Sequence, residues 1–369
     1  MPLRDALADV HPYRPQLPAR VLAQRLGLER VVKLASNEGA FGALPEAVAA
    51  YEATAGELAR YPDGGAASLR ATLAERHGVA VEQVVPGNGA DELIRLCGAA
   101  ALDAGDAAVF PWPSFPSYLS AATVHGATPV AVPLGPGRAV DLDAVLMACS
   151  SPAPRGGRVR LVFLANPNNP TGTLIEPGEL RRFLEALPDR ILCVLDEAYA
   201  EYAEPEPQGP ALLAEGRPRL CVLRTFSKVY GLAALRVGYA LASAEVAEAL
   251  DRVRPIFNVN QPAQEAATAA LRARAAVDQR VAHTRSARER LRQTLAGAGL
   301  EPVASQANFV YADVADGDGA GLADRLLAEG FMVRALGGFG APGAIRVTCG
   351  TDEENAAFAE ALARALPRG

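Results

Sequence analysis

The 369-residue chain is predicted to be an α/β protein with a mostly parallel sheet, followed by a smaller α+β domain. Short apolar segments typical of buried strands occur at 107–110, 128–132, 160–164, 191–196, 220–224 and 236–241. Segments with helical patterning at 90–102, 117–125, 177–187 and 243–254 separate most of them. This alternation favours a parallel sheet covered by helices on both faces. Ligands of such sheets bind at the carboxyl ends of the strands.

The pattern changes after Arg254. A long stretch rich in Ala, Arg and Gln at 260–297 is predicted to be helical and to connect two domains. Short strands at 308–314, 332–334 and 344–347 then alternate with helices at 322–329 and 352–366, the last of which begins with a capping box from Thr351 to Glu354. We therefore expect an N-terminal arm and first helix over 1–40, which pack with the small domain, a large domain over 41–254 and a small domain over 255–369.

Composition restricts the classes of partner. The formal net charge is −6 and no dense basic tract occurs, which argues against nucleic acid and anionic membranes as partners. Five widely spaced cysteines without a C-x-x-C pair indicate neither a disulfide framework nor a metal site. The N-terminus lacks the pattern of a signal peptide, and no apolar run approaches about 18 residues. These features predict a cytoplasmic soluble protein whose partners are small soluble ligands or other proteins.

Lys228 is one of only two lysines, in a chain that otherwise uses arginine for its basic residues. Lysine can lose its proton and form a Schiff base, whereas arginine keeps its proton and its planar fork cannot act as an amine nucleophile. Thr225, Ser227 and Arg236 surround this lysine in the sequence and are suited to binding a phosphate. A helix-capping or surface lysine is the alternative interpretation of Lys228 alone.

Three further motifs accompany this lysine. PGNGADE at 86–92 follows an apolar stretch and begins a helix, whose backbone N–H groups are suited to an anion. NPNNPTG at 166–172 is a rigid turn that presents the Asn169 amide, and VLDEAY at 194–199 ends a strand with Asp196. A plain turn or a helix cap would explain each motif alone. Together, a lysine, an acid, a phenol, an amide and a phosphate cradle indicate a pyridoxal-phosphate site.

The order GNGADE, NPNNPTG, DEAY, TFSK and R-x-G-Y resembles that of fold-type I pyridoxal-phosphate-dependent aminotransferases. SNE, RYPDG, VR and IRVTCGT, at 36–38, 60–64, 333–334 and 345–351, resemble the histidinol-phosphate aminotransferase group in particular. The resemblance covers nearly the whole chain. It implies a large domain with a mostly parallel seven-stranded sheet flanked by helices, and pyridoxal 5'-phosphate as the cofactor.

The resemblance also implies roles for single residues around the cofactor. Lys228 would form the aldimine with the cofactor and move the substrate proton, and Asp196 would keep the ring nitrogen protonated. Tyr199 and Asn169 would hydrogen-bond the ring oxygen, and Phe115 would stack on the ring, with Tyr118 as the alternative. The groups expected to hold the phosphate are the backbone of Ala90 and Asp91 and the side chains of Thr225, Ser227 and Arg236.

Substrate and partner contacts follow from the same resemblance. Arg346 would grip a substrate carboxylate and Arg334 would help to hold a distal phosphate, while Asn37 and Tyr13 lie in segments that close over the substrate. Tyr61 matches a tyrosine that reaches the cofactor phosphate of the other subunit. The active unit would therefore be a homodimer with shared active sites.

Three departures from the family pattern affect the expected substrate. Gly39 and Ala40 replace the usual Asn-Pro of SNENP, Phe257 stands where a tyrosine is frequent, and ALGGFGAPGA follows Arg334. All three are expected near the substrate and away from the cofactor. They leave the cofactor chemistry intact and bear on the identity of the amino donor. The resemblance as a whole predicts ping-pong amino transfer from histidinol phosphate to 2-oxoglutarate in histidine biosynthesis.

Other activities on the same scaffold remain open. An aromatic amino-acid aminotransferase acting on phenylalanine or tyrosine is the nearest alternative, and a decarboxylase of a phosphorylated amino acid is the next, because the cofactor directs several reactions through one carbanion. A catalytically silent ligand-binding protein of this fold is the alternative from a different class. The complete set of chemical groups and the lack of a basic DNA-binding extension argue against it.

Overall fold

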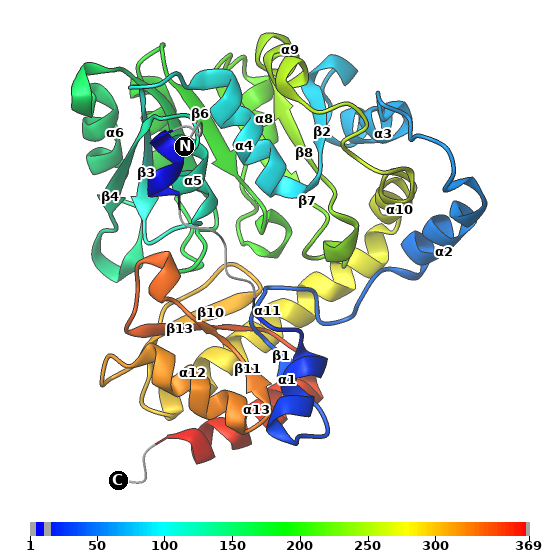
Figure 1. Cartoon of the computed structure of the whole chain (residues 1–369), viewed down its shortest axis with the longest axis vertical. Coiled ribbons are helices and arrows are strands. Elements are labelled where there is room, and N and C mark those ends of the chain that lie inside the picture. Colours follow the sequence, from blue (N-terminus) through cyan, green and yellow to red (C-terminus); the bar gives the residue numbers. More distant parts are fainter. Residues whose placement is uncertain (1–4, 11–15, 367–369) are drawn as a thin grey trace.

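The computed structural model describes residues 5–10 and 16–366, which form a larger and a smaller lobe (Figure 1). The larger lobe is built on a seven-stranded sheet and the smaller one on a four-stranded sheet with a separate two-stranded ribbon. The chain is thus an α/β protein with an additional α+β unit, as predicted. No helix of the described residues is long and apolar enough to cross a membrane.

The seven-stranded sheet has the order β2-β8-β7-β6-β5-β3-β4. Only β8 runs antiparallel to its neighbours, so the expectation of a mostly parallel sheet is confirmed. Its strands are β2 (Val84–Gly87), β3 (Ala107–Trp112), β4 (Thr128–Pro133), β5 (Val159–Ala165), β6 (Leu192–Asp196), β7 (Leu220–Thr225) and β8 (Gly238–Ala242).

Two details of this sheet differ from the sequence-based expectation. The edge strand β2 was not predicted, because its four residues include a proline and a glycine that disfavour strands. Strand β8 begins at Gly238 instead of Arg236, because Arg236 has a φ of 56° and such a left-handed residue cannot continue a strand.

Helices cover both faces of the sheet, and two separate hydrophobic clusters lie beneath them. One face packs against α4 (Gly89–Ala101), α5 (Ser117–Thr123) and α9 (Ala244–Val253). The other packs against α3 (Ala67–His77), α6 (Leu142–Ser150), α7 (Pro177–Ala186), α8 (Gly209–Ala214) and α10 (Gln261–Arg272), with α2 (Pro45–Ala53) lying against α10. Successive residues of β6 alternate between the clusters, as the two-residue period of a strand requires.

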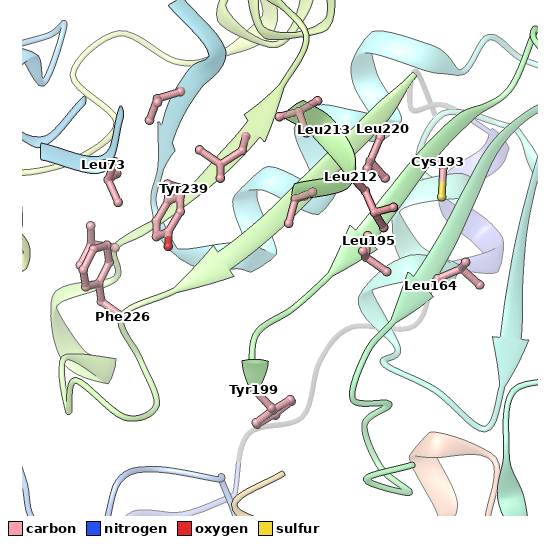
Figure 2. Packing of buried hydrophobic residues seen from close by; sticks show 14 of the residues in the cluster. Leu73, Leu164, Cys193, Leu195, Tyr199, Leu212, Leu213, Leu220, Phe226 and Tyr239 are labelled. Carbon is pink, nitrogen blue, oxygen red and sulfur yellow. The ribbon is translucent and has the colours of Figure 1, made fainter. Parts of the chain in front are cut away.

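Figure 2 shows part of the second cluster, which includes Leu195 of β6, Leu220 of β7 and Tyr239 of β8. Tyr199 and Phe226 belong to the same cluster and lie just beyond the strand ends. Because Phe226 is fixed in the core, the turn that follows β7 is held in place by apolar packing.

The smaller lobe contains an antiparallel sheet of order β12-β13-β10-β9, with strands β9 (Glu301–Pro302), β10 (Phe309–Asp313), β12 (Arg334–Ala335) and β13 (Ala344–Thr348). Helices α12 (Gly319–Ala328) and α13 (Asp352–Ala365) pack on it, and the predicted capping box is present at the start of α13. The predicted strand at 332–334 is divided: Met332 belongs to β11 (Phe331–Met332), which pairs with β1 (Val32–Lys33), while Arg334 pairs with β13.

The connection between the lobes differs from the single helix expected at 260–297. The chain breaks at Ala273, with φ of −82° and ψ of 47°, into α10 and α11 (Arg274–Gly297). Helix α11 runs from the larger lobe into the smaller one (Figure 1). The remaining elements are α1 (Ala19–Leu26) and the short 3-10 helices Asp5–Asp9, Ala55–Glu57, Val81–Gln83, Pro136–Arg138, Pro154–Gly156, Ala200–Tyr202, Ala233–Leu235 and Gly337–Phe339.

Glycine is required immediately after the lysine turn. Gly231 has a φ of 74°, and a Cβ atom there would lie 2.0 Å from the carbonyl oxygen of Gly42. We expect Gly231→Ala to lower the free energy of unfolding by about 2 to 4 kcal/mol, because strain and a backbone clash add together. Gly216→Ala is the matched control: its φ is 85° but it has open space, so its cost should be about 1 kcal/mol. Equal thermal unfolding midpoints for the two variants would contradict this account.

Candidate active site

The carboxyl ends of three adjacent parallel strands bring the predicted chemical groups together. Asn169 lies in the turn after β5, Asp196 ends β6, and Thr225 ends β7 with Lys228 three residues later. All are buried or nearly so, and they face the smaller lobe, whose strand β13 contributes Arg346. The position agrees with the rule that open α/β sheets bind ligands at this edge.

An anion cradle lies at the start of α4. A Cβ atom at Gly89 would be 2.6 Å from Nη2 of Arg236, so only glycine lets the helix and the guanidinium approach so closely. Arg236 donates to the Ser227 hydroxyl at 3.4 Å, and the Thr225 hydroxyl donates to Ser227 at 3.0 Å. A helix N-terminus, two hydroxyls and a guanidinium together suit a phosphate group.

The backbone of Ala90 and Asp91 forms the first turn of this helix, where N–H groups have no acceptor within the helix. The Asp91 carboxylate is engaged elsewhere, since it accepts from Arg95 at 3.2 Å and from the Ser117 hydroxyl. A backbone role for both residues therefore fits the arrangement. The donor set matches the phosphate group of the expected cofactor.

Asp196 is buried and accepts two hydrogen bonds, from the Tyr118 hydroxyl at 2.7 Å and from the N–H of Ala198 at 3.1 Å. Burial raises the pKa of its carboxyl group, and the two hydrogen bonds oppose that rise. A protonated ring nitrogen is a suitable counter-charge for a carboxylate in this position. The contact with Tyr118 was missed by sequence reasoning, because it joins two residues 78 positions apart.

The two candidates for stacking on the cofactor ring occupy different environments. Tyr118 is fully buried and stacks on Phe163 with 4.7 Å between ring centroids, so one face of its ring is already covered. Phe115 is half-buried and contacts Tyr118 edge-on. This arrangement favours Phe115 as the residue that stacks on a bound ring.

The Lys228 amine lies 5.4 Å from the centroid of the Tyr199 ring and donates to the Ser36 carbonyl at 3.4 Å. Burial, helped by the positive charge of Arg346, lowers the pKa of this amine to about 8. Gly39 lies against the backbone of Lys228, since a Cβ atom at Gly39 would be 2.8 Å from the Lys228 carbonyl oxygen. This departure from the family pattern was expected near the substrate, and the structure places it against the lysine turn.

The two predicted substrate arginines are cross-strand neighbours, because Arg334 pairs with Arg346 in the β12-β13 ladder. Arg346 is 3% exposed and donates to Asn169 Oδ1 and, at 2.8 Å, to the Ala35 carbonyl. Its guanidinium lies between the rings of Phe309 and Phe339, 5.2 and 5.3 Å from their centroids. Arg334 is half-buried and reaches the same Ala35 carbonyl at 3.5 Å. Arg346 thus places a positive charge near Lys228, and Arg334 lies beside Arg346 on the neighbouring strand.

The three remaining predicted residues, Asn37, Tyr61 and Tyr13, have different positions. Asn37 lies within the site, where it donates to the Tyr199 hydroxyl at 2.9 Å. Tyr61 lies on the surface, is 83% exposed and stacks on Phe257. Tyr13 falls outside the described residues. Among the described residues, no group of three His, Cys, Asp or Glu side chains is arranged to hold a metal ion.

Residues 29–362 match the family model for aminotransferase class I and II. Histidinol-phosphate aminotransferases from Maricaulis maris and Anaeromyxobacter sp. are 42% and 43% identical to this chain, over 97% and 98% of both sequences. The crystal structure of histidinol-phosphate aminotransferase from Sinorhizobium meliloti in complex with pyridoxal-5'-phosphate superimposes with a TM-score of 0.89 at 30% identity, covering 99% of this chain and 97% of that one. A single mutant of Thermus thermophilus aspartate aminotransferase gives a TM-score of 0.85 at 25% identity, covering 99% and 100%.

The lowered pKa of Lys228 predicts how the cofactor-free protein captures pyridoxal 5'-phosphate. Only the neutral amine attacks the aldehyde, so the rate should rise with pH and level off above about 8. Arg346→Met should move this midpoint upward because a neighbouring positive charge is removed, while Arg274→Met, on an exposed part of α11, should not. Rapid-mixing absorbance measures the rate. A midpoint near about 10.4, the value of an ordinary lysine, would contradict the assignment.

Proposed function

Because the chain belongs to the class I and II aminotransferase family, we propose that it transfers the amino group of histidinol phosphate to 2-oxoglutarate with pyridoxal 5'-phosphate as cofactor. One observation carries this proposal. Lys228 and the phosphate cradle lie at the same edge of the sheet as the arginine pair Arg334 and Arg346. The names of the closely similar relatives support the choice of amino donor.

The cofactor, when bound, supplies an electron sink for the negative charge that develops on the substrate α-carbon. The cradle of Thr225, Ser227, Arg236 and the α4 N-terminus would hold its phosphate. Asp196 would keep its ring nitrogen protonated. Tyr199 and Asn169 would bind its ring oxygen, and Phe115 would cover one face of the ring.

Lys228 would hold the cofactor in the resting enzyme and act as the proton carrier once substrate has displaced it. A pKa of about 8 suits both tasks, since a base works best when its pKa lies near the working pH. The amine is buried, so water is kept from the proton that it moves. The Ser36 carbonyl would orient the amine after substrate has displaced it from the cofactor.

The arginine pair would select the substrate by its negative charge. In glutamate, the carbon that bears the amino group also bears the α-carboxylate. In histidinol phosphate, the phosphate ester extends from that carbon in place of the carboxylate. One anion site would therefore serve both half-reactions. Arg346 is held between two aromatic rings with its fork oriented by Asn169 and Ala35, which prepares it for bidentate contact with an anion. Arg334, on the neighbouring strand, would add a second charge for the phosphate.

The active unit would be a homodimer. Leu58, Tyr61, Ile256 and Phe257 form an apolar surface patch, in which the first three side chains are 71%, 83% and 86% exposed. Asn258 joins this patch to the phosphate cradle, since its carbonyl accepts from Asn88 and its amide donates to Glu92. A second copy of the chain covering the patch would bring its Tyr61 toward the neighbouring cradle. Large exposed apolar patches of this kind are typical of protein interfaces.

The amino donor is tested by adding single amines to the cofactor-loaded protein and following its visible absorption. We expect histidinol phosphate and glutamate to react, and Lys228→Ala to abolish the reaction. Arg334→Met should lower kcat/KM about tenfold or more for histidinol phosphate and less for glutamate, because only the former offers a phosphate to the second arginine. Faster reaction with phenylalanine or tyrosine would favour the aromatic alternative, and release of carbon dioxide without amino transfer would favour a decarboxylase.

The dimer is tested by placing a charge in the patch. Ile256→Asp should sediment as a monomer and lose most activity, because a buried carboxylate at the interface lacks a partner. Met147→Asp is the control, since Met147 is 67% exposed on α6, outside the patch. Mixing Lys228→Ala with Tyr61→Ala should restore part of the activity, because one site of the mixed dimer is complete. A fully active Ile256→Asp monomer would contradict the proposal.

A further inference from the structure

Asn37 is held on several sides in a conformation that few residues adopt. It is 1% exposed and has a φ of 56°, in the left-handed region that asparagine tolerates better than most side chains. Its N–H donates to the Thr348 hydroxyl at 3.0 Å, and its carbonyl accepts from the Asn308 amide at 3.0 Å. The smaller lobe therefore fixes the backbone of Asn37 beside the cofactor site.

The hydrogen bonds of Thr348 determine which way the Asn37 amide points. The Thr348 oxygen accepts from the Asn37 N–H, and its own hydrogen goes to Asn37 Oδ1 at 3.1 Å. With Oδ1 bound in this way, the Nδ2 group faces the Tyr199 hydroxyl at 2.9 Å. An amide nitrogen can only donate, so the phenol oxygen accepts and its hydrogen must point elsewhere.

We propose that Thr348 and Asn37 are positioning residues, which make Tyr199 a hydrogen-bond donor toward the ring oxygen of the bound cofactor. This inference rests on the proposed cofactor site. Thr348 lies two residues after Arg346 on β13, so the strand that carries the substrate anchor also sets the direction of this hydrogen bond.

The charged groups around Tyr199 leave the phenol able to donate. Burial is the main influence and raises the pKa of its hydroxyl, with Asp196 acting in the same direction, while Arg346 and the Asn37 hydrogen bond oppose the rise. The Lys228 amine faces the ring from the β7 turn, and Phe309 packs against it edge-on from β10. Replacing Thr348 with valine changes none of these charges and removes both hydrogen bonds from its hydroxyl to Asn37, so its effect would report the hold of Thr348 on Asn37.

A donor at the ring oxygen affects the titration of the bound cofactor in a defined direction. The oxygen carries an unshared negative charge only in the deprotonated form, so the donor stabilises that form and lowers the pH midpoint of the visible absorption change. If the Asn37 amide turned its oxygen toward Tyr199, the phenol hydrogen would be drawn away from the cofactor. The midpoint would then rise.

The test is a pH titration of visible absorption in the cofactor-loaded protein. Thr348→Val removes the hydroxyl with little change of shape and should raise the midpoint by about 0.5 to 1 pH unit, the size expected for one lost hydrogen bond. Tyr199→Phe should raise it at least as far. The double variant should match Tyr199→Phe alone, because both changes act through one hydrogen bond.

Two further variants separate positioning from general damage. Thr348→Ser keeps the hydroxyl and should keep the parent midpoint. Thr268→Val is the matched control, because Thr268 is similarly buried but bonds to the Gln264 carbonyl within α10, and its midpoint should not move.

Two results would overturn the inference. One is an unchanged midpoint in Thr348→Val, and the other is a double variant whose shift is the sum of the single shifts. A parent protein that develops no visible band with pyridoxal 5'-phosphate would instead overturn the cofactor site itself, together with everything that depends on it.

Discussion

The segment from Ala35 to Gly39 is the constraint on which the rest of the site depends. Its Ala35 carbonyl accepts from both proposed substrate arginines, Arg334 and Arg346, and its Ser36 carbonyl accepts from Lys228. Asn37 contacts Tyr199 and the smaller lobe, and Gly39 lies against the Lys228 carbonyl. Four residues of this segment thus hold the Lys228 amine, the Tyr199 phenol and the proposed substrate anchor Arg346 in one geometry.

In the proposed function, the positive charge of Arg346 would link substrate recognition to the chemistry of Lys228. Its guanidinium is buried beside the Lys228 amine and helps to lower the pKa of that amine to about 8, so a larger fraction of the amine is neutral near physiological pH than in an ordinary lysine. An anionic substrate group bound to Arg346 would offset this charge and make protonation of the amine easier. Substrate binding would therefore raise the basicity of the lysine at the moment when it has to take up a proton. The same arginine would serve both half-reactions.

Much of this arrangement could be predicted from the sequence, because its causes are local. The strands β3 to β7 follow from apolar segments between helices, and Asp196, Thr225 and Lys228 could be placed at strand ends from chain order alone. Contacts between distant residues could not be predicted in this way. The Asn37 and Thr348 pair joins positions 311 apart, and the break of the long helix at Ala273 leaves no strong signal in an alanine-rich stretch. Sequence patterns predict which face of a helix or strand is buried, but they do not predict which distant polar groups form a hydrogen bond.

The most direct test of the central claim uses the scarcity of lysine in this chain. Borohydride reduction of the cofactor-loaded protein makes the lysine linkage permanent, and peptide mass mapping then locates it. The account predicts a label on the peptide that contains Lys228 and none on the peptide that contains Lys33, the only other lysine. A label on Lys33, or an unlabelled Lys228 peptide in protein that shows the visible band, would contradict it.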